Sequence, residues 1–470
     1  MSGVRVLRRV LVANRGEIAV RVMRTCRRLG IETVLTVSDA DAGSRPARLA
    51  DQVIRIGPAA AAASYLSVDA VVGAAVAARA DAVHPGYGFL SENARLARAC
   101  AAAGIAFIGP DPEVLEATGD KLAAREHAAA AGLPVLPGGT LAATGLAARI
   151  GYPVLVKAAG GGGGRGLRVV RDPAELDQAV ALAGAEAEAA FGDPRVYLER
   201  YVERARHVEV QLLGDGGHVI HLGDRDCSVQ RRYQKLIEEA PAPGLDDGLR
   251  ERLRAAAVTL GERLRYRGAG TVEFLVDPER GEFYFLEVNA RIQVEHPVTE
   301  AVTGIDIVAE QLAVAEGRPL RLNQADVTLH GHAIEVRLNA EDAGAGFRPS
   351  PGTVSRAVFP AGDGVRVDTH LQAGATVPPY YDSLLAKVIA HASDRDGARR
   401  ALQHALESCV IDGVTTNLGL QRALLADPAF AEGGVDTGYL ARWLARRPAG
   451  NGAGDRQAAT VRDSPGDGDG

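Results

Sequence analysis

The sequence lacks an excess of basic residues, a long apolar run and an apolar leader. Its 470 residues include 53 Lys and Arg against 59 Asp and Glu, so the net charge is −6. This balance argues against nucleic acid as the main partner, although a local basic pocket for a nucleotide is compatible with it. No charge-free apolar stretch reaches the ~18 residues of a membrane helix, and the N-terminal segment has no secretory-signal pattern. We therefore expect no membrane span and no export.

Cysteine is also scarce. The four residues Cys26, Cys100, Cys227 and Cys409 are scattered, with no Cys-x-x-Cys pair and no histidine at zinc-finger spacing. This pattern argues against a zinc site and predicts free thiols in a reducing cytoplasm.

Strand and helix patterns alternate in the first part of the chain. We expect strands at 6–13, 31–37, 80–84 and 105–108, and helices at 18–29, 69–79 and 94–103. Strands separated by such helices predict right-handed crossovers and a mainly parallel, Rossmann-like sheet. The segment has no G-x-G-x-x-G motif, which argues against a dinucleotide site of that kind.

The pattern then changes to hairpins and a mixed α+β region. Residues 111–132 read as helical with a loop at 118–121, and we expect helices at 249–266, 305–316 and 395–409. Extended runs are expected at 154–157, 167–170, 196–202, 208–213, 218–222, 270–276, 282–295, 332–337, 353–358, 365–369 and 387–392. The final twenty residues are rich in Gly, Asp, Ala and Pro, which predicts disorder.

Five consecutive glycines, Gly160 to Gly164, lie between two β-branched stretches. The flanking pattern predicts a hairpin tip, where backbone amides can converge on phosphate oxygens. Lys157 and Arg165 at the two ends would add positive charge. Compositional drift in a chain with 55 glycines is the alternative interpretation.

Polar and apolar residues alternate from Glu287 to Glu295. In a strand this places Glu287, Asn289, Arg291, Gln293 and Glu295 on one face. A half-exposed structural strand is the default interpretation. Two carboxylates, counting Glu273 on the preceding run, and one amide are also the oxygen ligands that Mg²⁺ prefers, and a guanidinium can hold an oxyanion.

A third polar cluster spans 225–235 and is followed by Glu238 and Glu239. Charge runs of this kind are usually solvated strands. Beside a phosphate loop and a metal site, however, Lys235 is a candidate for holding a small anion.

These segments resemble the biotin carboxylases of the ATP-grasp superfamily over residues 5–445. The matching stretches are 13–18, 84–93, 119–121, the glycine segment, 206–211, 226–232, 239–243, 291–300 and 337–342. The resemblance implies an α/β and α+β multidomain fold. Its parts are a Rossmann-like domain at 1–112, an ATP-grasp domain at 113–322 with a mobile glycine-rich lid at about 132–203, a C-terminal mixed α+β domain at 323–447, and a tail at 448–470.

Site residues follow from the resemblance position by position. It implies that Lys121 and Lys157 contact ATP phosphates, that Gly163 and Gly164 close over them, that Glu199, Arg200, Tyr201 and Val202 line the adenine pocket, and that His207 and Gln230 face the ribose. It further implies that Glu273, Glu287 and Asn289 hold two Mg²⁺ or Mn²⁺ ions. Bicarbonate would be bound by Lys235, Arg291, Gln293 and the backbone of Val294, with Glu295 as general base and Arg337 stabilising the biotin enolate.

The implied reaction is ATP-dependent carboxylation of biotin by bicarbonate through carboxyphosphate, the first half-reaction of an acyl-CoA carboxylase. Two residues depart from the family pattern: Tyr233 replaces a histidine common near the nucleotide, and Arg200 replaces a lysine. With only Met1 and Met23, the chain has no Met-Lys-Met biotinylation motif. We therefore expect biotin on a separate carrier protein or as the free molecule, a carboxyltransferase partner and, from resemblance, a homodimer.

Two alternatives remain at this point. Another ATP-grasp ligase would couple ATP to a different carboxylate and ignore biotin, and an inactive nucleotide-binding subunit would not turn over.

Overall fold

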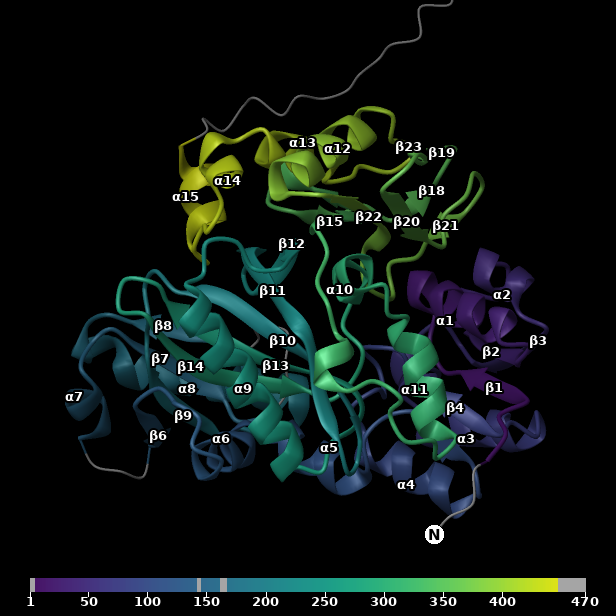
Figure 1. The fold of residues 1–470 in the computed structure, drawn as a ribbon, viewed down its shortest axis with the longest axis horizontal. Helices are drawn as coiled ribbons and strands as arrows, with labels where there is room; N and C mark the ends of the chain where they lie inside the picture. Colours follow the sequence, from purple (N-terminus) through teal and green to yellow (C-terminus); the bar gives the residue numbers. More distant parts are fainter. Residues whose placement is uncertain (1–4, 142–144, 161–166, 447–470) are drawn as a thin grey trace, which may run out of the picture.

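The computed structural model describes residues 5–141, 145–160 and 167–446. Its N-terminal part is a five-stranded sheet in which every neighbouring pair is parallel (Figure 1). In spatial order the strands are β3 (Gln52–Gly57), β2 (Glu32–Ser38), β1 (Arg9–Val12), β4 (Ala82–His84) and β5 (Ala106–Phe107). The predicted parallel sheet is therefore confirmed.

Helices cover both faces of this sheet, because its central strands are apolar on both sides. One face packs against α1 (Gly16–Arg28) and α11 (Ile307–Ala315), and the other against α3 (Val68–Ala77) and α4 (Ala94–Ala102). Sequence patterns missed the edge strand β3 and the short helix α2 (Arg45–Leu49). Half of the residues of β3 are exposed and only one is buried, so it lacks the apolar alternation that marks a buried strand.

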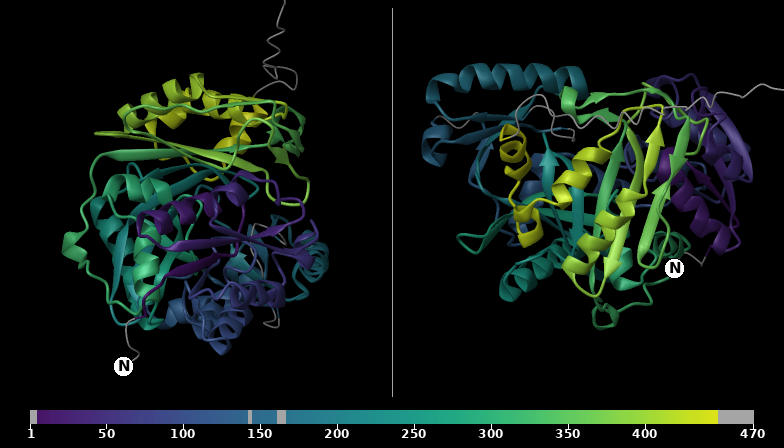
Figure 2. Two further views of the ribbon diagram at one scale, coloured as in Figure 1. Left: turned by 90° about the vertical axis from the view of Figure 1, so that its right-hand side faces the viewer. Right: turned by 90° about the horizontal axis from the view of Figure 1, so that it is seen from above.

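Two helices lead into a separate four-stranded sheet. The predicted helical segment is α5 (Pro112–Gly119) and α6 (Lys121–Ala130), interrupted at Asp120. The sheet is antiparallel, in the order β6 (Gly138–Thr140), β9 (Val196–Arg200), β7 (Val154–Ala158) and β8 (Arg168–Val170). It packs against α7 (Leu146–Ile150) and α8 (Leu176–Phe191), and Figure 2 shows this unit projecting to one side.

The predicted hairpin around the glycine run is confirmed for its two strands. β7 and β8 pair antiparallel, from Val154 opposite Val170 to Val156 opposite Arg168. Gly163, Gly164 and Arg165, which come between these strands in the sequence, lie outside the described residues, as does the predicted disordered tail.

The largest sheet has eight strands, all antiparallel to their neighbours. The order is β14 (Glu282–Asn289), β13 (Arg267–Asp277), β10 (Arg206–Asp215), β11 (Val219–Arg231), β12 (Gln234–Ala240), β15 (His332–Asn339), β22 (Leu384–Ala392) and β20 (Val365–Thr369). Its apolar side chains pack against α9 (Asp247–Arg263) at one end and against α12 (Arg395–Glu407) and α13 (Leu418–Leu425) at the other. The sheet is continuous across the predicted boundary at residue 323.

Two expectations about extended segments were wrong, and a third was too short. The run 282–295 is a strand only to Asn289, because the Ala290 amide then donates to Glu92 Oε1 at 3.0 Å and the chain turns toward α10 (His296–Thr303). The run 218–222 is part of the much longer β11. The run 353–358 is divided into β18 (Gly352–Thr353) and β19 (Arg356–Val358), which pair with different strands.

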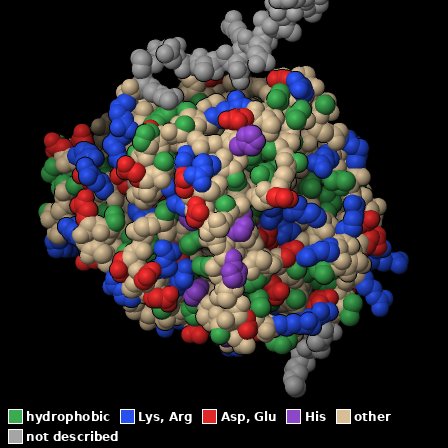
Figure 3. Space-filling model, turned by 45° about the horizontal axis from the view of Figure 1, so that its top comes forward, with side chains coloured by type: hydrophobic (Ala, Val, Ile, Leu, Met, Phe, Trp, Pro, Cys, Tyr) green, Lys and Arg blue, Asp and Glu red, His purple; other side chains and the backbone are tan. Residues whose placement is uncertain are grey.

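Short elements complete the C-terminal part. They are β16 (Glu341–Asp342), β17 (Arg348–Pro349), β21 (Thr376–Val377), β23 (Val410–Asp412), α14 (Pro428–Glu432) and α15 (Tyr439–Ala445). In the described part of the chain, no helix is both long and apolar enough to cross a membrane. Basic and acidic side chains are interspersed on the face shown in Figure 3.

Candidate active site

Lys235 lies at the centre of a group of buried carboxylates on the eight-stranded sheet. Its Nζ lies 2.6 Å from Glu209 Oε2, 2.8 Å from Glu273 Oε1 and 2.6 Å from Glu295 Oε1. Burial alone would lower the pKa of Lys235, but Cys227 and the three carboxylates raise it well above its ordinary value. The predicted anion-binding lysine is therefore a permanent cation. Its segment is a hairpin with an exposed tip and largely buried strands, rather than a solvated strand.

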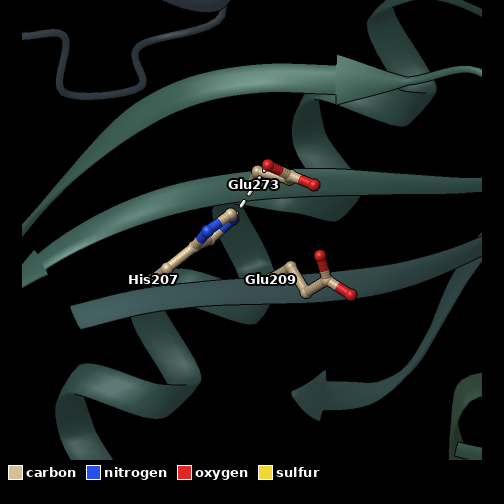
Figure 4. Close-up of side chains that lie close together, drawn as sticks. All are labelled: His207, Glu209 and Glu273. Carbon is tan, nitrogen blue, oxygen red and sulfur yellow. Dashed lines mark ion pairs between the residues drawn. The ribbon is translucent and has the colours of Figure 1, made fainter. Parts of the chain in front are cut away.

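Strand register explains why the carboxylates gather. Glu209 on β10 is paired with Glu273 on β13, and Glu273 with Glu287 on β14. Residues directly opposite each other in antiparallel strands share a face, and two like charges in such positions destabilise the sheet. Lys235 and His207 offset that repulsion. His207 Nε2 lies 2.8 Å from Glu273 Oε2 (Figure 4), and this contact outweighs burial and raises the pKa of His207.

Glu273, Glu287 and Asn289 meet at one end of this row. Asn289 Nδ2 donates to Glu273 Oε1 at 2.9 Å. Among the described residues, the half-buried Glu287 carboxylate has no hydrogen-bond or ion-pair partner. It does help to offset the lowering of the Lys121 pKa by burial, so a cation faces it. Two carboxylates and an amide oxygen are hard ligands, and this donor set fits Mg²⁺ or Mn²⁺.

The segment after β14 folds its polar side chains back onto the same site. Arg291 donates from one terminal nitrogen to Asn289 Oδ1 and from the other to Gln293 Oε1, both at 2.8 Å, and from Nε to Glu92 Oε2 at 2.9 Å. Gln293 Nε2 in turn donates to Glu273 Oε1 at 3.2 Å. The predicted convergence of these residues is therefore present, but a turning loop creates it rather than strand alternation.

Glu295 is the last residue before α10 and its side chain is fully buried. Its Oε1 accepts from Lys235 at 2.6 Å, and its Oε2 accepts from an Arg337 terminal nitrogen at 2.8 Å. Burial would raise the pKa of Glu295, but Lys235 and Arg337 lower it well below the ordinary carboxyl range. Glu295 is therefore an ionised carboxylate between two cations.

A second buried lysine lies on the four-stranded sheet. Lys157 Nζ donates to Glu199 Oε2 at 2.9 Å, and Arg125 holds the other oxygen of Glu199 at 3.0 Å. Burial opposes the charge on Lys157, but Glu199 raises its pKa above the ordinary value. The Lys121 amide donates to the carbonyl of Ala159 at 3.0 Å, so α6 starts beside the end of β7. Both predicted phosphate lysines thus lie near the glycine segment.

The other predicted nucleotide residues occupy neighbouring strands. Arg200 ends β9, Tyr201 and Val202 follow it, and all three are half-buried. Gln230 is buried on β11. Tyr233 lies at the tip of the β11–β12 turn with a φ of 68°, and 44% of it is exposed.

Sequence reasoning gave no site role to Glu92, Glu209, Glu238 or Lys387. Glu209 had a readable signal, because His207 and Glu209 alternate with valines and so share a strand face. The others come from distant parts of the chain. Lys387 on β22, for example, donates to the Val294 carbonyl at 2.7 Å.

Three family models match the chain in sequence order. They are described as the biotin carboxylase N-terminal domain (residues 6–115), the ATP-binding domain of the carbamoyl-phosphate synthase L chain (120–323) and the biotin carboxylase C-terminal domain (335–442).

The chain is also similar to proteins of known name. It is 51% identical to the biotin carboxylase of Pseudomonas aeruginosa over 93% of this chain and 99% of that protein. A biotin carboxylase complex with β,γ-ATP from Campylobacter jejuni superposes with a TM-score of 0.90 at 45% identity, covering 93% and 99% of the two chains.

A third relative is the biotin carboxylase domain dimer of the Hydrogenobacter thermophilus 2-oxoglutarate carboxylase, in complex with MgADP, ADP and bicarbonate. It has a TM-score of 0.89 at 45% identity, covering 93% of this chain and 97% of that one. These likenesses extend over nearly the whole length and confirm the predicted multidomain ATP-grasp fold. The chain belongs to the biotin carboxylase family.

Proposed function

We propose that this protein carboxylates biotin with bicarbonate and ATP, yielding carboxybiotin, ADP and phosphate through carboxyphosphate. It would be an ATP-dependent C–N ligase that performs the first half-reaction of an acetyl-CoA or acyl-CoA carboxylase. The observation that carries the proposal is Glu295, an ionised and fully buried carboxylate held between Lys235 and Arg337. A base placed between two cations suits an anionic substrate that must lose a proton.

In the proposed complex, ATP lies between the four-stranded and eight-stranded sheets. Lys121 and Lys157 contact the phosphates, and Gly163 and Gly164 complete that contact from the lid. Residues 199–202 surround the adenine, largely through backbone groups, and His207 and Gln230 face the ribose. Glu273, Glu287 and Asn289 would hold two Mg²⁺ or Mn²⁺ ions, which neutralise phosphate charge when bound.

Bicarbonate binds beside Lys235 in this proposal. Arg291, Gln293 and the Val294 amide orient it, and Lys387 holds the carbonyl of Val294. Bicarbonate is a weak nucleophile, so its hydroxyl proton is transferred to a Glu295 oxygen while Lys235 and Arg291 hold the resulting dianion. A carbonate oxygen then attacks the γ-phosphorus, the bond to the ADP oxygen breaks, and carboxyphosphate forms.

Carboxyphosphate then releases CO₂ and phosphate inside the site. The phosphate removes the ureido N–H proton of biotin, and the nitrogen attacks CO₂. Arg337 stabilises the negative charge that develops on the ureido oxygen. The lid, proposed at about 132–203, would exclude water and so protect carboxyphosphate from hydrolysis.

Partners are part of the proposal. A biotin carboxyl carrier protein would present biotin, and a carboxyltransferase would use the product. A homodimer is supported by the dimer of the Hydrogenobacter domain. The four cysteines are unpaired thiols, which supports a cytoplasmic location. The domain division at residues 112, 322 and 447 remains a prediction.

Release of ADP by purified protein tests the proposal. We expect ADP release with Mg²⁺ to be slow with ATP alone and to rise when bicarbonate and free biotin are both added. A rate unchanged by both additions would contradict the proposal and favour an inactive nucleotide-binding subunit. A rate that rises only with another carboxylate would indicate a different ATP-grasp ligase.

A further inference from the structure

Two carboxylates hold the Arg337 guanidinium, and they differ in what else they touch. Glu295 Oε2 accepts from a terminal nitrogen at 2.8 Å, while its other oxygen accepts from Lys235. Glu238 Oε1 accepts from Arg337 Nε at 2.6 Å and also contacts the same terminal nitrogen that Glu295 holds. Arg337 is the one side chain of the described residues that holds Glu238 by a hydrogen bond or ion pair, whereas Glu295 is shared with the bicarbonate-binding lysine.

Glu238 is placed where solvent cannot replace that partner. It lies on β12 with no exposed surface, and its Oε2 is buried without a hydrogen-bond partner among the residues described. Directly opposite on β15 lies Glu335, also fully buried, with both oxygens unpartnered in the same sense. Burial raises the pKa of Glu335 well above its ordinary value, and Glu238 adds to that rise. Glu335 is therefore neutral beside a partner that can carry the charge.

The proposed reaction changes the charge of only one of Arg337's partners. When Glu295 accepts the bicarbonate proton it becomes a neutral acid, and its ion pair with Arg337 weakens. Glu238 binds the edge of the guanidinium formed by Nε and one terminal nitrogen, and it does not contact Lys235 through any hydrogen bond or ion pair found in the described chain. Its hold on the guanidinium therefore persists through the step that weakens the contact between Glu295 and the terminal nitrogen.

We infer that Glu238 is a positioning residue for Arg337. It holds the guanidinium at the biotin site while Glu295 is protonated and the ion pair between Glu295 and Arg337 weakens. The inference rests on the proposed function, because it assigns Glu295 as the base and Arg337 to biotin. It adds a residue that touches no substrate and acts through Arg337.

The next residue along β12 offers a matched control. Glu239 is also a buried carboxylate, but its side chain is on the opposite face of the strand. It accepts from His332 at 2.8 Å and from Arg395 at 2.6 Å. A Glu239→Gln substitution therefore breaks a buried ion pair of similar kind without touching Arg337.

The pH dependence gives a second readout. Burial raises the pKa of Glu238, Arg337 lowers it and Glu295 raises it, and together they bring it to about 7. Glu238 is thus ionised above neutral pH and increasingly protonated below it, which weakens its hold on Arg337. The titratable and charged groups that face it are Arg337, Glu335, Glu295, Lys235 and Cys227.

The test is steady-state kinetics of the full chain with free biotin, comparing wild type with Glu238→Gln. We expect kcat/KM for biotin to fall about 10- to 100-fold, with KM for MgATP and for bicarbonate within about 2-fold of wild type. When kcat/KM for biotin is measured as a function of pH, its fall on the acid side of pH 7 should be smaller in this variant than in wild type. Glu335→Gln, which imitates a neutral acid, and Glu239→Gln should leave the KM for biotin within about 2-fold.

Three results would overturn the inference. One is an unchanged kcat/KM for biotin in Glu238→Gln. Another is an equal loss toward all three substrates, which would mark a structural role. The third is a fall in kcat/KM for biotin in Glu239→Gln that equals the fall in Glu238→Gln. If Glu238→Gln does not fold, Glu238→Asp, which keeps the charge but shortens the reach, should show a smaller loss of the same selectivity. A wild type that ignores biotin would instead overturn the proposed function itself.

Discussion

The parallel five-stranded sheet and the antiparallel eight-stranded sheet differ in where they carry charged side chains. Val10, Leu11 and Val12 on the central strand of the first are all fully buried apolar residues, with helices on both faces. The second buries one apolar face and uses the other for Glu209, Glu273 and the groups around Lys235. A parallel sheet covered on both sides leaves no face for chemistry, whereas an antiparallel sheet can give one face to a site.

This difference predicts that changes on the polar face alter rate selectively, while changes in the parallel sheet alter stability. Glu295→Gln should have the largest effect on activity. Loss of the proposed base should lower bicarbonate-dependent ADP release at least ~100-fold, because general-base catalysis contributes about that much or more. ADP affinity measured by calorimetry should stay within about 3-fold of wild type. A bicarbonate-dependent rate above about a tenth of wild type would remove Glu295 as the base.

Arg337→Ala should rank next. It removes the cation that we assign to the biotin enolate, so biotin carboxylation should fall about 100-fold while nucleotide binding is retained. Arg204→Ala is the control, because that side chain is 75% exposed. Equal losses in biotin carboxylation and in ADP affinity would contradict the assignment of Arg337 to biotin.

Lys157→Met should have a moderate effect confined to the nucleotide. The substitution removes a buried charge that we assign to the phosphates, and KM for MgATP should rise about 10-fold, equivalent to ~1.4 kcal/mol. Initial rates over a range of ATP concentrations, at fixed bicarbonate and biotin, measure the change. A normal KM for MgATP would show that the Lys157–Glu199 pair is structural.

Leu11→Ala should have the smallest effect on activity. Leu11 is fully buried. Truncation of such a leucine to alanine lowers the free energy of unfolding by about 2–5 kcal/mol. The folded variant should keep its kcat/KM values within about 2-fold. Urea unfolding followed by kinetics below the transition separates the two quantities. A fall in kcat/KM for only one substrate would contradict the view that the parallel sheet contributes stability rather than catalysis.

Sequence reasoning predicted the parallel sheet because apolar strands and helices alternate there with clear boundaries. The exposed edge strand β3 was missed for want of that signal. The polar set from Glu287 to Glu295 was correctly grouped, yet β14 ends at Asn289 and a loop turns the remainder inward. Alternation describes local structure only, and the loop is anchored by Glu92, which is distant in sequence.

Partners of the charged residues could not be predicted for the same reason. The pairing of Arg337 with Glu238 follows from the adjacency of β12 and β15, which are separated by about 90 residues of intervening chain. The resemblance assigned residues to the substrates but did not name the side chains that hold those residues in place. Glu238, Glu335 and Lys387 become visible only when strand order and register are known.

Transfer of radiolabelled bicarbonate to biotin tests the central claim most directly. Purified protein with MgATP, labelled bicarbonate and free biotin should form labelled carboxybiotin in step with ADP, and Glu295→Gln should form neither above background. Release of ADP without any label on biotin, under conditions in which carboxybiotin is stable, would contradict the account.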